Sequence, residues 1–123
     1  MNIQLGQYAG FCFGVDRAVN MVEEAAKAGG TVVTLGPIIH NHHVVDRFQR
    51  MGVEVANSPE EVRPGSTVVL RAHGVPRQVE ETLAGLPVQV VDATCPFVKR
   101  IHRLVQEAEA EGRTPVIIGT RTH

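Results

Sequence analysis

Short β-branched runs alternate with amphipathic segments along most of the chain, and this alternation constrains the fold more than any other feature. The run Thr31–Leu35 is typical of a buried strand, because β-branched residues in continuous apolar runs favour strands that are covered on both faces. The preceding segment, Val15–Ala28, has apolar side chains at helical spacing and stops at Gly29 and Gly30. Strands joined by helices favour a parallel sheet with helices on its faces. The sequence therefore predicts an α/β fold.

The same criteria predict the other elements. We expect strands at Ile3–Tyr8, Val53–Ala56, Thr67–Leu70, Val88–Val91 and Val116–Ile118. We expect helices at Asn41–Arg50, Pro76–Leu83 and Pro96–Glu111, and a capped turn or short helix at Asn57–Glu61.

A shift of 83 residues aligns the chain with itself and reveals an internal repeat. Without gaps, Cys12 falls on Cys95 and His40 falls on His123, and 11 of the 29 positions from 12 to 40 are identical. Shared apolar spacing explains the matching valines and glycines, but not the recurrence of the rarer cysteine and histidine. We therefore predict a first α/β unit over residues 1–92 and the beginning of a second over residues 93–123. Because half a unit exposes a sheet edge and a helix face, we expect the front part of a longer protein or pairing with another chain.

Both cysteines fall in loops between a predicted strand and a predicted helix: Cys12 in Gly10–Gly14, and Cys95 in Asp92–Pro96. A helix N-terminus stabilises the thiolate, which is the form that binds metals or attacks. One such cysteine alone is typical of a small buried apolar residue, but two in equivalent loops favour a shared site. Soft thiolates indicate an iron–sulfur or zinc centre. A thiol redox pair between Cys12 and Cys95 is a second hypothesis.

Histidines follow three of the predicted strands, and these are His40, His73 and His123. Because the carboxyl ends of parallel strands meet at one edge, we expect these side chains near the two cysteines. Imidazole N–H groups suit anionic oxygens, and Gly74 would let backbone N–H groups approach an anion closely. The pattern therefore predicts a site for a phosphate-like anion. We assign no role to the remaining histidines, His42, His43 and His102.

Composition excludes several classes of function. The net charge of −1 and the aromatic content of 4% argue against a surface that binds nucleic acid. No apolar run approaches the roughly 20 residues of a membrane helix. The first residues have neither a basic segment nor a long apolar segment, as a secretory signal would. We expect a cytoplasmic protein with reduced thiols.

Four motifs resemble those of the 4-hydroxy-3-methylbut-2-enyl diphosphate reductase (LytB/IspH) family: Gly10–Ala18, Ile39–Asn41, Ala72–Val75 and Asp92–Pro96. The terminal segment Ile118–His123 resembles the start of a third histidine motif of that family. The resemblance implies three pseudo-symmetric α/β units around a central 4Fe–4S cluster, with one cysteine contributed by each unit. This arrangement is consistent with the internal repeat.

The resemblance also implies roles for individual residues. Cys12 and Cys95 would bind the cluster, and His40, His73 and His123 would bind the diphosphate of the substrate. The implied reaction removes the allylic hydroxyl of 4-hydroxy-3-methylbut-2-enyl diphosphate and gives isopentenyl and dimethylallyl diphosphates. It is the last step of the non-mevalonate isoprenoid pathway, and reduced ferredoxin or flavodoxin supplies the electrons.

Some parts of the family pattern are missing from these 123 residues. The family has Pro-Glu after its third histidine, and the glutamate that takes part in proton delivery would lie beyond His123. A third cysteine is also absent. We therefore expect that this chain alone holds no stable 4Fe–4S cluster and does not turn over. The alternative is a non-enzymatic domain, derived from that family, that binds an anion or a metal.

Overall fold

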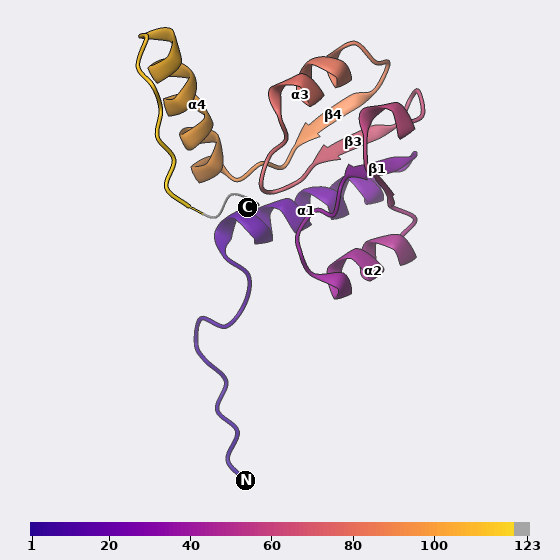
Figure 1. Ribbon diagram of the computed structural model, residues 1–123. Helices are drawn as coiled ribbons and strands as arrows, with labels where there is room; N and C mark the ends of the chain where they lie inside the picture. The colour runs from indigo at the N-terminus through magenta and orange to yellow at the C-terminus, as the bar shows by residue number, and fades with distance from the viewer. Residues whose placement is uncertain (120–123) are drawn as a thin grey trace.

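Four short strands form one parallel sheet in the computed structural model, which describes residues 1–119 (Figure 1). The strands are β1 (Val32–Leu35), β2 (Glu54–Ala56), β3 (Thr67–Leu70) and β4 (Gln89–Asp92). The helices are α1 (Phe13–Ala28), α2 (His42–Arg50), α3 (Arg77–Ala84) and α4 (Pro96–Ala110), with a 3₁₀ turn η1 (Pro59–Glu61). The predicted α/β class is confirmed, and most predicted elements lie within two residues of the observed ones.

The strand order across the sheet is β2-β1-β3-β4, and every neighbouring pair is parallel. The chain moves from β1 outward to β2 and then returns past β1 to form β3. Connections therefore leave the sheet in opposite directions at the carboxyl ends of β1 and β3. Such a switch point is where open α/β sheets open a crevice for ligands.

Two apolar layers sandwich the sheet, because successive side chains of a strand point to opposite faces. Val32 of β1 and Val69 of β3 pack with α1 and α2, whereas Val33 and Val68 of the same strands pack toward α3. Figure 1 shows α1 and α2 below the sheet and α3 above it. The sheet is therefore covered on both faces, as its continuous apolar strands predict.

Helix α1 buries a stripe of small and β-branched side chains against the sheet, namely Ala18, Val19 and Val22. It ends at Gly29, whose φ of +87° is a left-handed conformation that favours glycine. Helix α2 begins after Asn41, whose side chain accepts a hydrogen bond of 3.1 Å from the backbone N–H of His43.

Two predicted strands are wrong. Ile3–Tyr8 and Val116–Ile118 are not part of any sheet that the described residues form, and Leu5 and Ile118 are 87% and 97% exposed. An apolar run becomes a strand only when a neighbouring strand satisfies its backbone N–H and C=O groups. Neither run has such a neighbour within residues 1–119.

Helix α4 differs from the other helices because none of its side chains is buried. Phe97, Ile101 and Leu104 lie at i, i+4 and i+7, so they form one exposed apolar stripe. In Figure 1 this helix stands apart from the sheet.

The division of the chain at residues 92 and 93 stays a prediction. None of the helices in the described part is long and apolar enough to span a membrane.

Candidate functional site

Three loops meet just beyond the carboxyl ends of β1, β3 and β4, and they carry His40, His73 and Cys95. Backbone hydrogen bonds continue from loop to loop past the last residues of the strands. The N–H of Ala72 donates to the carbonyl of Ile38 at 3.2 Å, and the N–H of Cys95 donates to the carbonyl of Ala72 at 2.9 Å. The loops are therefore held in register with one another.

The rings of His40 and His73 lie 4.8 Å apart, centre to centre, with an angle of 40° between their planes. His40 is exposed and His73 is half-buried. These loops follow β1 and β3, so the pair lies at the switch point of the sheet. The structure brings together these two residues, as their positions in the sequence predict.

The two cysteines occupy equivalent places at helix N-termini. Cys12 is the N-cap of α1 and Cys95 is the N-cap of α4. A Cβ placed on Gly14, two residues after Cys12, would lie 2.5 Å from Sγ of Cys95. Cys95 therefore packs directly on the first turn of α1, and only a glycine at position 14 leaves room for its sulfur. Cys12 is exposed, Cys95 is half-buried, and both are free thiols.

Side chains on both sides hold the loop before Cys95. Arg17 of α1 donates from Nη1 to the carbonyl of Thr94 at 3.3 Å. The carboxylate of Asp92 accepts a hydrogen bond of 2.9 Å from the N–H of Thr94 and forms an ion pair with Lys99. Partial burial opposes ionisation of Asp92, but the bonds from Lys99 and Thr94 outweigh it and hold the pKa of this carboxyl below its ordinary value. Asp92 therefore links the end of β4 to the first turn of α4.

His102 makes a contact with Gly74 that the sequence does not predict. A Cβ on Gly74 would lie 2.8 Å from Cε1 of His102 and 3.2 Å from Cγ2 of Thr94. His102 therefore packs against the loop that carries His73, although its position in the sequence predicts no role. The other two histidines without a role, His42 and His43, lie on α2 with their ring centres 3.9 Å apart.

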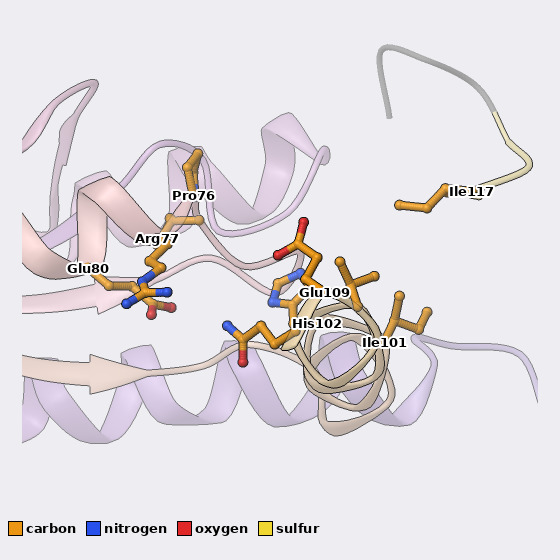
Figure 2. A pocket seen from close by; sticks show the side chains of 10 residues that line it. Pro76, Arg77, Glu80, Ile101, His102, Glu109 and Ile117 are labelled. Atoms are coloured by element: carbon orange, nitrogen blue, oxygen red, sulfur yellow. The ribbon is translucent and has the colours of Figure 1, made fainter. Parts of the chain in front are cut away.

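A groove of about 340 Å³ runs between α3 and α4 (Figure 2). Pro76, Arg77 and Glu80 line one side of it, and Ile101, His102 and Glu109 line the other. His40, His73 and the two cysteines are not among its lining residues. The groove therefore borders the His73 loop at Val75 and His102, but the predicted site residues do not line it.

The predicted site is thus partly assembled. His123 lies outside the described residues. Within residues 1–119, no group of three or more histidine, cysteine, aspartate or glutamate side chains is arranged to hold a metal ion. The three loops place imidazole donors for an anion next to the loop of Cys95, whose thiol is a ligand suited to a soft metal centre.

The sequence model of the LytB protein family matches residues 3–123, which is nearly the whole chain. The chain belongs to the LytB protein family. Its sequence is 44% identical over 124 residues to a 4-hydroxy-3-methylbut-2-enyl diphosphate reductase of Aquifex aeolicus. It is 46% identical over 123 residues to the reductase of the same name from Geobacter sulfurreducens.

Solved structures of the reductases resemble this LytB chain along nearly its full length. A structure of (E)-4-hydroxy-3-methyl-but-2-enyl diphosphate reductase, described as the terminal enzyme of the non-mevalonate pathway, matches 98% of the chain with a TM-score of 0.83 and 45% identity. A reductase structure from Plasmodium falciparum matches 95% of the chain with a TM-score of 0.90 and 30% identity.

The LytB chain spans less than half of the proteins that it matches. The two sequence matches extend over the whole of this chain, but they cover only 43% of the Aquifex protein and 43% of the Geobacter sulfurreducens protein. The structural matches cover 43% and 37% of the two solved chains. The similarity therefore concerns one part of those proteins.

Proposed function

We propose that this chain supplies part of the active site of a reductase acting on 4-hydroxy-3-methylbut-2-enyl diphosphate. The observation that carries the proposal is the His40–His73 pair, 4.8 Å between ring centres, next to the loop of Cys95. Its support from outside the chain is the similarity to proteins of that name. The proposal makes this chain part of an oxidoreductase of isoprenoid synthesis.

In the proposed function, His40 and His73 bind the diphosphate of the substrate, and His123 joins them. Each imidazole N–H donates a hydrogen bond to a phosphate oxygen, and such bonds are stronger than neutral ones because the acceptor is charged. His40 is exposed and His73 is half-buried, so the pair lies at the surface of the protein, where an anion arrives from solvent.

The cysteines fit two ligand positions of an iron–sulfur cluster. Cys12 and Cys95 are both N-caps, and Gly14 leaves the Cys95 sulfur room beside α1. Bound there, a 4Fe–4S cluster would supply the electrons for the reduction. The sequence has two cysteines, so a third thiolate ligand would have to come from outside these 123 residues. We expect this chain alone to hold no stable cluster and not to turn over.

The proposed net reaction is balanced by two electrons and two protons. The allylic C–O bond breaks, the hydroxyl leaves as water, and a C–H bond forms in isopentenyl or dimethylallyl diphosphate. Reduced ferredoxin or flavodoxin is the proposed electron source. The proposed compartment is the cytoplasm, where thiols such as Cys12 and Cys95 stay reduced.

A second candidate is a domain that binds an anion or a metal without catalysis. It is favoured by two features of the family pattern that these 123 residues lack, a third cysteine and the glutamate after the third histidine. The two candidates share anion binding by the histidine pair and differ in turnover.

Titration with inorganic diphosphate tests the shared step in the 123-residue chain. Replacing His40 or His73 by alanine removes a charge-assisted hydrogen bond worth roughly 1.5–3 kcal/mol, so the dissociation constant should rise about tenfold to a hundredfold. Isothermal titration calorimetry or ³¹P NMR gives that constant. His43→Ala, an exposed histidine of α2, is the matched control and should bind as the wild type does. Wild-type affinity in both His40→Ala and His73→Ala would remove these residues from the site.

A further inference from the structure

Arg71 lies between the two loops that carry the histidine pair. It follows β3 directly, and its side chain is half-buried. Its Nε donates a hydrogen bond of 3.1 Å to the carbonyl of Gly74, which closes the loop around His73 from within. One end of the guanidinium is therefore fixed to the His73 loop.

The other end of the same guanidinium lies on the His40 loop. A Cβ placed on Gly36 would lie 3.3 Å from Nη1 of Arg71 and 3.8 Å from its Cδ. Gly36 has a φ of +72°, and its N–H donates to the carbonyl of Ala56 at 2.7 Å. Arg71 therefore packs on the backbone where the chain leaves β1 toward His40.

None of the ion pairs within residues 1–119 involves Arg71. Its guanidinium donates a hydrogen bond to the carbonyl of Gly74 and packs against Gly36. One backbone bond, from Ala72 to Ile38, joins the same two loops, and it lies closer to the sheet than His40. The planar guanidinium is a rigid fork, so it can fix the distance between two backbone segments where a flexible lysine cannot.

We propose that Arg71 is a positioning residue that sets the separation of the His40 and His73 rings. It acts through the backbone of Gly36 and Gly74. The inference rests on the proposed function for its consequence, which is that anion binding by the histidine pair depends on Arg71. Its structural part, the spacing of the rings, can be measured without any ligand.

The experiment compares the wild type with Arg71→Met and Arg71→Lys in the 123-residue chain. With ¹³C-labelled histidine, ring-to-ring nuclear Overhauser effects between His40 and His73 report their separation. We expect these effects to fall at least threefold in Arg71→Met, and also in Arg71→Lys, which keeps the charge but has no Nε–H in a planar fork. Arg77→Lys is the matched control, because Arg77 is exposed and pairs only with Glu81 among the described residues.

Inorganic diphosphate is then titrated into the same variants. We expect the dissociation constant to rise about tenfold in Arg71→Met and to change less than twofold in Arg77→Lys. Circular dichroism verifies that each variant is folded; if Arg71→Met does not fold, Arg71→Lys decides. Ring effects and affinity at the wild-type level in a folded Arg71 variant would overturn the inference.

The two proposals fail in different ways. One outcome is that the wild type does not bind diphosphate, while the Arg71 variants lose the ring-to-ring effects that the wild type shows. This outcome contradicts the proposed function and supports the positioning role. A wild-type chain that binds diphosphate, with Arg71 variants that bind equally well and keep the ring effects, contradicts the positioning role alone.

Discussion

Residues 12–36 and residues 95–119 are two copies of one sequence pattern, and they have very different environments. In the first copy, α1 buries a stripe of side chains and the following run forms the central strand β1. In the second copy, α4 forms at the equivalent place but buries nothing, and the following run is not a strand. Leu35 is 5% exposed, and Ile118, its counterpart at the offset of 83 residues, is 97% exposed.

The difference teaches which part of the pattern is local. A helix satisfies its own backbone N–H and C=O groups, so α4 can form wherever its sequence favours a helix. A strand depends on neighbours for the same groups, and β1 has β2 and β3 on either side. The two copies therefore share their helices and differ in their strands.

The largest effect is expected from a matched pair of substitutions at equivalent positions. Leu35→Ala leaves a cavity in the layer beside α3 and should lower the free energy of unfolding by about 2–5 kcal/mol. Ile118→Ala removes an exposed side chain and should change that free energy by less than about 0.5 kcal/mol. Urea unfolding followed by circular dichroism measures both, since the chain has no tryptophan. Equal losses in the two variants would contradict the contrast between the copies.

Most elements of the fold were predictable because their signals are local. Apolar spacing and the stop at Gly29 predict α1, and proline at the front predicts the start of α4 at Pro96. The two wrong strands, Ile3–Tyr8 and Val116–Ile118, differ because a strand needs a neighbouring strand to form. Apolar residues report a tendency to be buried, but they do not report whether a neighbouring strand is present.

The candidate site was predictable to a similar degree. A histidine after a strand must lie at the carboxyl edge of a parallel sheet, so the meeting of His40 and His73 follows from topology. The approach of His102 to Gly74 does not, because it depends on the angle at which α4 leaves β4. The same applies to Arg71, whose position over Gly36 is set by two loops at once.

An intermediate effect is expected where the two copies meet. Gly14 of the first copy corresponds to Phe97 of the second, and only Gly14 faces the sulfur of Cys95. Gly14→Ala would place a Cβ 2.5 Å from that sulfur, so we expect a loss of about 1–3 kcal/mol from overpacking. Urea unfolding measures this loss, and maleimide labelling should show Cys95 reacting faster than in the wild type.

Gly6→Ala is the control for this substitution, because a Cβ there would meet only Ala9, at an ordinary distance of 3.9 Å. It should leave both measurements unchanged. If Gly14→Ala were as stable as the wild type and labelled at the same rate, the close contact between α1 and Cys95 would be wrong.

The smallest effect concerns the ion pair that joins β4 to α4. The folded pKa of Asp92 is lowered, so the carboxylate stabilises the fold above its unfolded pKa of about 3.9 and loses that contribution as the pH falls through the lowered value. Lys99 and Asp92 are partly exposed, so the contribution should be about 0.5 kcal/mol. Unfolding free energies between pH 7 and pH 2 should show a shallower acid decline in Asp92→Asn.

Asp46→Asn, an exposed carboxyl on α2, is the reference for this comparison and should keep the wild-type acid decline. An identical pH profile for Asp92→Asn and the wild type would mean that the junction of the two copies does not depend on this charge.

Main-chain hydrogen bonds join the loops at the sheet edge. They run from the N–H of Ala72 to the carbonyl of Ile38 and from the N–H of Cys95 to the carbonyl of Ala72. Only proline, which has no N–H, would delete them, so the bases of these loops keep their spacing when other side chains are exchanged. The spacing of the rings farther out is the part that we assign to Arg71. Chemical groups other than Arg71 can therefore be altered one at a time without moving the bases of the loops. A sheet edge held by main-chain hydrogen bonds is suited to diversification, since new side-chain chemistry can arise there while these bonds stay in place.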